Sequence, residues 1–296
     1  MTEQTWMTGT PTRLLLATDL SARCDRALDR AAQLAGEWRA ELLVLNVVEA
    51  PQAPDLVLAW AAGNDDASNV RIAQRQLQHD LAGLDVRASM RIARGDAASA
   101  IREVAADSGC GLVVTGMARN ETLGRFLPGS TVESLARTLP QPLLVVRNRV
   151  RGAYRRIVVA TDFSDSSRHA LHAAARMLPR RELILYHAYT LPLSEISAKA
   201  PDARIGRDIE RGECARFLAA SDLPDEARSR LRVVIEEGAL ETSLTRYVRE
   251  QGVDLVVMGT HGRSGLMNIL LGSAAARLLD WLPCDTMIVR RPRATA

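Results

Sequence analysis

The second half of the 296-residue chain repeats the first. The segments "RLLLATDLS" at residues 13–21 and "RIVVATDFS" at 156–164 both run from an apolar stretch into Ala-Thr-Asp, and Asp162 follows Asp19 by 143 residues. The same shift relates four later pairs: Gly95 and Gly238, Gly116 and Gly259, Gly129 and Gly272, Ser130 and Ser273. Because one spacing holds at anchors spread along most of each half, we interpret the chain as a tandem duplication.

Apolar strands alternate with amphipathic helices in the second half. We expect strands at 156–160, 182–189, 231–237, 253–259 and 286–291, and helices at 166–178, 205–220, 240–251 and 273–281. Near-continuous apolar strands separated by helices of about ten residues or more indicate parallel strands buried on both faces. Each half is therefore predicted to be a doubly wound α/β domain with a five-stranded, parallel-type sheet flanked by helices.

The length suits two domains of about 150 residues each. A boundary is expected near "RNRVRGAY" at 147–154, a short charged linker that contains Gly152. We expect a flexible lead at 1–12, a first domain at 13–148 and a second domain at 155–291.

Composition excludes several classes of protein. The formal charge of +3 is small and the basic residues are spread along both halves, which argues against nucleic-acid binding as the main function. The first twelve residues lack the apolar segment of a secretory signal, and no apolar run approaches the roughly 18 residues of a membrane span, so a cytoplasmic location away from membranes is expected. The four cysteines lie far apart, which suggests neither a zinc site nor a disulfide framework. Lys199 is the single lysine, which excludes a lysine-containing P-loop.

The segment "GTHGRSGLMNILLGS" at 259–273 is the candidate binding loop. Gly259 directly follows a predicted strand, and Gly272 and Ser273 precede a predicted helix. In open parallel sheets ligands bind beyond the carboxyl ends of the strands, and a helix N-terminus attracts anions. Glycines let backbone amides approach a ligand closely. The loop therefore predicts a phosphate site, with Asp162 projecting into the same crevice.

A reading without a ligand stays open for the same residues. Gly259 and Gly272 could be turn and cap residues, Ser273 could be an N-cap, and Asp162 could cap the helix that follows it.

The glycine loop, together with "VVATDFS" and "PCDTMIV", resembles the universal stress protein family in its tandem-domain form, over nearly the whole chain from Arg13 to Arg290. The nucleotide-binding members of that family carry glycine, two residues, glycine, nine residues, then glycine and serine or threonine. The pattern is complete here at Gly259, Gly262, Gly272 and Ser273. The resemblance implies a Rossmann-like, adenine nucleotide-binding fold and bound ATP.

The resemblance also implies a role for particular residues. By part of the ATP molecule they are Thr161 and Asp162 for the ribose and phosphate end, Ala188 for the adenine through its backbone, Met258 and Gly259 for the ribose, and Gly262, Gly272, Ser273 and the amide of Ala274 for the phosphates. The family more often has valine where Ala188 stands, which predicts looser adenine packing. Magnesium is expected on phosphate oxygens and water, with no protein side chain as ligand, because no carboxylate cluster is apparent.

The matching loop of the first half is "GMARNETLGRFLPGS" at 116–130. It keeps Gly116, Gly129 and Ser130, but Arg119 replaces the second glycine. If that position needs a left-handed backbone, an L-residue costs roughly 1–2 kcal/mol there. The Arg119 side chain would enter the phosphate space, pair with Glu121, or direct its guanidinium at a phosphate.

Other features of the first half are compatible both with a bound ligand and with the absence of one. Ser130 and Glu133 fit a capping box that needs no ligand. The first half keeps Thr18 and Asp19, and Val47 stands at the position of the adenine-facing residue. The residues expected to form the crevice are therefore still present. We hypothesise that the second half holds ATP and that the first is tuned or silent.

The remaining candidate groups supply no catalytic residue. His169 and His172 could share a metal, but a solvated helix face is the favoured interpretation. His187 is interpreted as a packed strand residue, and His261 as either a surface residue or a ligand contact. No general base for hydrolysis is evident.

We therefore expect ATP as a bound regulator in a stress response, with at most weak hydrolysis. The alternatives are a nucleotide-independent interaction or chaperone-like module, and a slow ATPase. The last strands of the halves, "PLLVVR" and "TMIVRR", are candidates for edge pairing. In the family such strands pair across a dimer, so the chain is expected to be a covalent pseudo-dimer, with further homodimerisation left open and the protein partners unknown.

Overall fold

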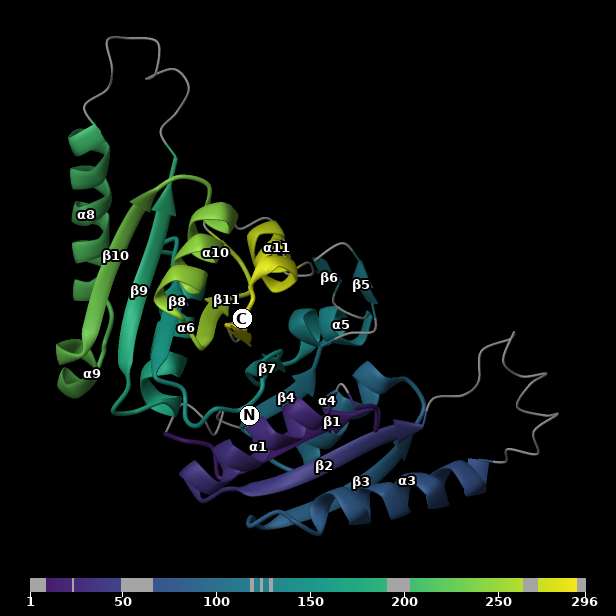
Figure 1. Ribbon diagram of the computed structural model, residues 1–296. Coiled ribbons are helices and arrows are strands. Elements are labelled where there is room, and N and C mark those ends of the chain that lie inside the picture. The colour runs from purple at the N-terminus through teal and green to yellow at the C-terminus, as the bar shows by residue number, and fades with distance from the viewer. Residues whose placement is uncertain are drawn as a thin grey trace, which may run out of the picture.

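The computed structural model describes residues 9–22, 24–48, 66–117, 120–122, 125–127, 130–190, 203–262 and 271–291 (Figure 1). In the first half the elements are β1 (Arg13–Thr18), α1 (Asp25–Trp38), β2 (Glu41–Val48), α3 (Asp66–Leu81), β3 (Ala88–Arg94), α4 (Ala97–Asp107), β4 (Leu112–Gly116), β5 (Asn120–Thr122), β6 (Arg125–Leu127), α5 (Ser130–Thr138) and β7 (Leu143–Val146). In the second half they are β8 (Arg156–Ala160), α6 (Asp165–Met177), β9 (Glu182–Tyr189), α8 (Ala203–Ala219), α9 (Asp225–Ser229), β10 (Leu231–Glu237), α10 (Leu240–Gln251), β11 (Leu255–Gly259), α11 (Ser273–Trp281) and β12 (Asp285–Val289).

The two halves share one ten-stranded sheet, in the order β10-β9-β8-β11-β12-β7-β4-β1-β2-β3. Within each half all neighbouring strands are parallel, so each half contributes the predicted five-stranded sheet. The last strands, β7 and β12, pair antiparallel with Leu144 opposite Met287. The expected edge pairing of these two strands is thus confirmed, and it leaves neither last strand as an open edge.

Helices cover both faces of the sheet, and each face carries one apolar core that runs through both halves. One core packs α1, α3, α6 and α8 on alternate strand residues such as Leu14, Leu16 and Val159. The other packs α4, α5, α10 and α11 on the residues in between, such as Leu15 and Val158. This alternation buries both faces of the inner strands, which explains why their sequences are apolar almost throughout. The expectation of burial on both faces is wrong for the edge strands β3 and β10, in which no residue is buried.

The predicted elements of the second half are all present. The bounds of β8, β9, β10, α10 and α11 agree with the prediction, and those of the others differ by one or two residues at one or both ends. The sequence did not predict α9 or the antiparallel β5–β6 hairpin, because elements this short show no periodicity. The hairpin extends from the first half toward α11 of the second (Figure 1).

The repeat extends to the backbone conformation. Leu20 and Phe163, which are related by the 143-residue shift, have φ of 60° and 63°. Gly109 and Gly252 likewise have φ of 62° and 59°. A left-handed backbone is rare for a bulky residue such as Leu or Phe, so its presence at equivalent positions marks a turn that both halves need.

None of the helices in the described part of the chain has the length and apolar character needed to span a bilayer.

Candidate functional site

The turn after β8 positions Asp162. The Phe163 amide donates to Thr161 Oγ1 at 2.9 Å, and the Ser164 amide donates to Asp162 Oδ1 at 3.1 Å. Thr161 Oγ1 also lies 2.9 Å from Ser167 Oγ in α6, and the Thr161 side chain is buried. The Thr161 hydroxyl is therefore used within the turn, whereas Asp162 stays half-buried at the carboxyl end of the strand.

The neighbouring strand β9 fixes this turn from the side. His187 Nδ1 lies 2.8 Å from the Thr161 carbonyl oxygen, and its Nε2 lies 3.1 Å from Glu210 of α8. The Phe163 ring contacts the His187 ring at a centroid distance of 4.3 Å. His187 is thus a packed strand residue, as predicted. Ala188 follows it, half-buried and opposite Glu236 of β10.

Gly259 ends β11 where no side chain fits. A Cβ atom there would lie 2.5 Å from Ser166 Oγ and 2.8 Å from the Ser166 carbonyl oxygen. Because the carbonyl belongs to the backbone of α6, it cannot move aside as a side-chain end can. Gly259 is therefore required for α6 to pack on β11 even without a ligand. The preceding Met258 side chain lies in the core, which leaves only its backbone for a ligand.

Gly262 faces the Asp162 carboxylate. A Cβ at Gly262 would lie 2.8 Å from Asp162 Oδ2, and Gly262 does not have a left-handed backbone. At Gly262, close approach to the aspartate and not φ is what a side chain would disturb. Arg119, the equivalent residue of the first half, lies outside the described residues, so its conditional backbone strain stays a prediction.

Gly272 connects the loop to α11. Its amide donates to the Thr260 carbonyl oxygen at 2.8 Å, and a Cβ there would lie 3.0 Å from the same oxygen. Gly272 is the N-cap and the exposed Ser273 is the first helical residue, so the reading of Ser273 as the N-cap is wrong. No side chain in the described part of the chain caps α11, which leaves first-turn amides, Ala274 among them, available to an anion.

Ser166 is a site residue that sequence reasoning missed. It is buried at the start of α6, where its Oγ accepts from the His261 amide at 3.3 Å. His261 Nδ1 in turn lies 2.8 Å from Thr260 Oγ1. Ser166 thus joins the first turn of α6 to the glycine loop, and the polar run "SDSS" at 164–167 was the only signal for it.

The first half builds the same turn. The Leu20 amide donates to Thr18 Oγ1 at 3.0 Å, the Ser21 amide donates to Asp19 Oδ1 at 3.0 Å, and Asn46 Nδ2 donates to the Thr18 carbonyl oxygen at 3.0 Å. Asp19 Oδ1 also accepts from Ser21 Oγ at 2.6 Å and from Cys24 Sγ at 3.1 Å. Asp19 is therefore held in the turn by Ser21 and Cys24.

The strand registers support the other equivalences. Arg13 pairs with Glu41 as Arg156 pairs with Glu182, which places Val47 in the position of Ala188. Gly116 is buried at the end of β4, and Ser130 begins α5. Arg119, Gly129 and the side chain of Ser130 lie outside the described residues, as do the middle of the second loop at 263–270 and the lead at 1–8.

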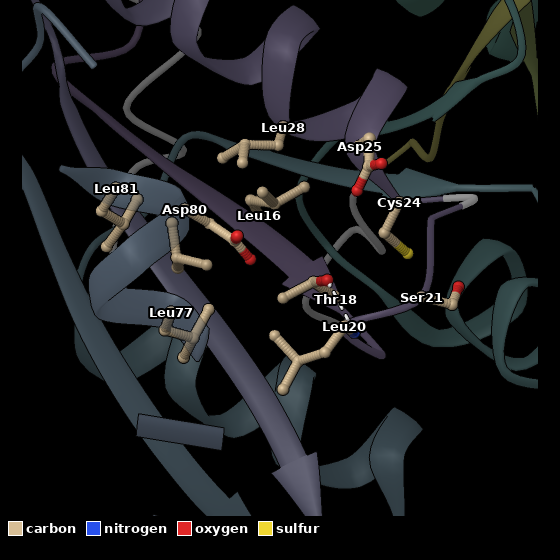
Figure 2. A pocket seen from close by; sticks show the side chains of 11 residues that line it. Leu16, Thr18, Leu20, Ser21, Cys24, Asp25, Leu28, Leu77, Asp80 and Leu81 are labelled. Atoms are coloured by element: carbon tan, nitrogen blue, oxygen red, sulfur yellow. Dashed lines mark hydrogen bonds between the residues drawn. The ribbon is translucent and has the colours of Figure 1, made fainter. Parts of the chain in front are cut away.

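A small cavity lies beside Thr18, between α1 and α3 (Figure 2). Its volume is about 10 Å³, and Leu20, Leu77 and Asp80 are among the residues that line it. A space of that size admits at most one water molecule. It cannot hold an adenine ring.

The interpretation of His169 and His172 as a solvated face is wrong. Both residues of α6 are half-buried. Burial, with smaller contributions from His172, Arg291 and Arg176, lowers the pKa of His169 to about 4, and burial also lowers the pKa of His172. The described residues contain no group of three His, Cys, Asp or Glu side chains placed to hold a metal.

The depressed pKa of His169 predicts acid sensitivity. The folded state favours neutral His169, whereas the unfolded chain binds a proton below about pH 6.5, so stability is lost as the pH falls from 6.5 toward 4. Urea unfolding midpoints at pH 7 and 4.5 should differ less in His169→Gln than in the unsubstituted protein. His79→Gln, at an exposed position of α3, should leave the difference unchanged. Equal pH dependence in all three proteins would contradict the prediction.

Comparison with known proteins identifies the family. The model of the universal stress protein family matches the chain twice, at residues 11–147 and 153–290. The chain belongs to the universal stress protein family. A universal stress protein of Mycolicibacterium smegmatis is 27% identical over 298 residues, which cover 94% of this chain and 96% of the relative. One from Mycobacterium tuberculosis is 32% identical over 143 residues, or 46% of this chain and 97% of the relative.

A solved structure shares the tandem fold. The universal stress protein of Archaeoglobus fulgidus superimposes with a TM-score of 0.62 at 18% identity, covering 95% of this chain and 99% of that one. The predicted fold class and the tandem form of the family are therefore confirmed.

Proposed function

We propose that the second half binds ATP in the crevice beyond the carboxyl ends of β8 and β11. The observation that carries this proposal is the close approach of the Gly262 backbone to the Asp162 carboxylate, where a Cβ would lie 2.8 Å from Oδ2, next to a helix whose N-cap residue, Gly272, has no capping side chain. An anion-binding helix start with a glycine backbone in front of it is suited to phosphate groups. The complete glycine pattern of the nucleotide-binding family members supports the same assignment.

In this proposal the residues divide by part of the nucleotide. Gly262, Gly272, Ser273 and Ala274 hold the phosphates through backbone amides, while the backbones of Met258 and Gly259 line the ribose and that of Ala188 meets the adenine. Asp162 lies at the phosphate end and would repel phosphate oxygens directly, so it fits a bound magnesium ion that phosphate oxygens and water hold in the main. Thr161 supports Asp162 through the turn.

We propose that the occupied site acts as a regulator and that the two halves differ in it. The second half takes the nucleotide, whereas the first half has Arg119 at the position of Gly262. Calorimetric titration with ATP and magnesium should therefore give about one nucleotide per chain. Two equally tight sites per chain would contradict the specialised halves but not the second-half site.

A second candidate function rests on the packing of two glycines. Gly259 against Ser166 and Gly272 against Thr260 both have structural reasons that need no ligand, as an interaction or chaperone-like module requires. Denaturing freshly purified protein and removing the precipitate by centrifugation distinguishes ATP binding from a nucleotide-independent module. Adenine nucleotide in the supernatant supports ATP binding, and its absence together with no thermal shift on adding ATP and magnesium supports the module.

A slow ATPase remains a third candidate. It requires phosphate release above background that disappears in a Gly262 variant.

A further inference from the structure

The junction of the two halves contains a cavity of about 620 Å³. Three parts of the chain that are distant in sequence form its wall. They are α1 with Arg26 and Arg30, the linker at 148–155, and the turn at 252–254 that precedes β11. Volumes of this size are typical of small-molecule sites.

The wall is strongly basic. Its lining residues include five arginines, which are Arg26, Arg30, Arg149, Arg151 and Arg155, and one carboxylate, that of Asp254. The single acid is already engaged, because Asp254 Oδ2 accepts from the backbone amides of Arg155 and Arg156 at 2.9 and 3.0 Å. The positive charges of the cavity therefore exceed what its own acid can compensate.

Two of the arginines, Arg26 and Arg30, are held in place by contacts with the linker and with Asp285. Arg30 is buried, lies 3.4 Å from Asp285, and donates to the Gly152 carbonyl oxygen at 2.9 Å. Arg26 donates to the Arg147 carbonyl oxygen at 2.7 Å. These contacts tie α1 to the linker and fix one side of the cavity.

The other three arginines reach the cavity from the linker. Arg149, Arg151 and Arg155 are exposed, and within the described part of the chain no side-chain partner is recorded for them. Like charges gathered without a counter-ion raise the free energy of the folded state, and a bound polyanion relieves that repulsion. The guanidinium fork matches the geometry of phosphate oxygens, which makes arginine the residue suited to such a ligand.

We propose that this cavity, which we call the arginine groove, binds a compact polyanion with several phosphate groups. Among the described residues that line it, Ala153 and Val253 are the only ones with apolar side chains, and none has an aromatic ring. Recognition therefore depends on charge and not on stacking of a base, so an inorganic polyphosphate chain fits the groove better than the base of a nucleotide does.

The arginine groove is separate from the proposed ATP site. It shares no lining residue with that site and lies at the amino end of β11, whereas the glycine loop follows the carboxyl end. At about 3.3 Å per residue, the five residues of β11 separate the two by roughly 15 Å. A ligand in the groove would contact both halves and the linker at once.

Calorimetric titration with inorganic tripolyphosphate at about 0.15 M salt tests the proposal. The full chain should bind tripolyphosphate, and Arg149→Ser/Arg151→Ser/Arg155→Ser should weaken that binding roughly 100-fold. The matched control is Arg71→Ser/Arg75→Ser/Arg91→Ser, which removes the same charge from exposed positions on α3 and β3. We expect the control to change the affinity less than about 3-fold.

Several outcomes would overturn the proposal. An equal loss in both triple variants would mean a diffuse positive field. Full binding by the groove variant, or no binding by the unsubstituted chain, would mean that the groove takes no polyphosphate, as would binding of a DNA duplex without binding of tripolyphosphate. Loss of tripolyphosphate binding in Gly262→Val would place it at the ATP site instead. Should the triple variant fail to fold, Arg151→Gln alone should still weaken binding measurably, and an unchanged affinity there would equally refute the groove.

Discussion

Replacing Asp285 by alanine should lower the free energy of unfolding by about 3–5 kcal/mol. The Asp285 side chain is fully buried at the start of β12. Its Oδ2 accepts from Tyr154 Oη at 2.6 Å and faces Arg30 Nε at 3.4 Å, while its Oδ1 accepts from the Arg147 and Asn148 amides at 2.8 and 3.0 Å. Removing the carboxylate leaves a buried guanidinium, a buried phenol and two amides without this acceptor.

The same contacts hold the halves together. Arg30 belongs to the first half and Asp285 to the second, and Tyr154 of the linker contacts both, with the Arg30 guanidinium 4.0 Å from the centre of its ring. Burial and the neighbouring Asp285 carboxylate raise the pKa of Tyr154 well above 10, so the phenol remains a donor at neutral pH. The cluster therefore links α1, the linker and the start of β12, next to the antiparallel pairing of β7 and β12.

Chemical denaturation of Asp285→Ala and of Glu226→Ala measures the effect. Glu226 pairs with Arg230 on the surface of α9, and losing such an exposed pair should cost about 1 kcal/mol or less. Asp285→Asn, which keeps an acceptor for the amides, should fall between the two. A loss at Asp285 no greater than at Glu226 would show that the buried cluster contributes nothing to closing the junction.

The importance of Asp285 could have been suspected from the sequence. By the 143-residue shift that relates the halves, Asp285 is the equivalent of Pro142. The second half therefore has an acid where the first has a proline, at the start of a buried strand. Its partners could not be predicted, because Arg30 lies more than 250 residues away and the repeat gives no pairing across halves. The arginine groove escaped prediction for the same reason, since three distant segments form it.

Hydrophobic periodicity was sufficient to predict the helices and strands whose local sequence preference agrees with their place in the fold. Strands β9 and β10 are apolar runs between turns, and α10 ends at Gly252, whose left-handed φ of 59° is a common helix stop. The candidate site could be proposed from the sequence as a set of residues but not as a geometry. The glycine pattern pointed to Gly262, and the structure adds that a Cβ there would lie 2.8 Å from Asp162 Oδ2 although the backbone φ is not left-handed.

Gly262→Val should weaken ATP binding by about 10- to 100-fold and change the melting temperature little. Hydrogen bonds to charged groups contribute about 1.5–3 kcal/mol each, and 1.4 kcal/mol is tenfold in affinity, so losing one phosphate contact gives that range. Within the described part of the chain, the new Cβ would lie within 4 Å of the Asp162 side chain alone, with Oδ2 at 2.8 Å, and the end of a side chain can move without disturbing the backbone. The cost therefore falls on binding and not on folding.

Substitutions at two further glycines, compared by ATP titration and by unfolding, distinguish an effect on binding from an effect on packing. Gly83→Ala, where no atom lies within 4 Å of the new Cβ, should alter neither affinity nor stability. Gly259→Ala, whose Cβ would lie 2.8 Å from the Ser166 carbonyl oxygen, should cost about 1–3 kcal/mol of stability whether or not ATP is present. If Gly262→Val binds ATP as tightly as the unsubstituted chain, the assignment of the phosphate groups to the glycine loop is wrong.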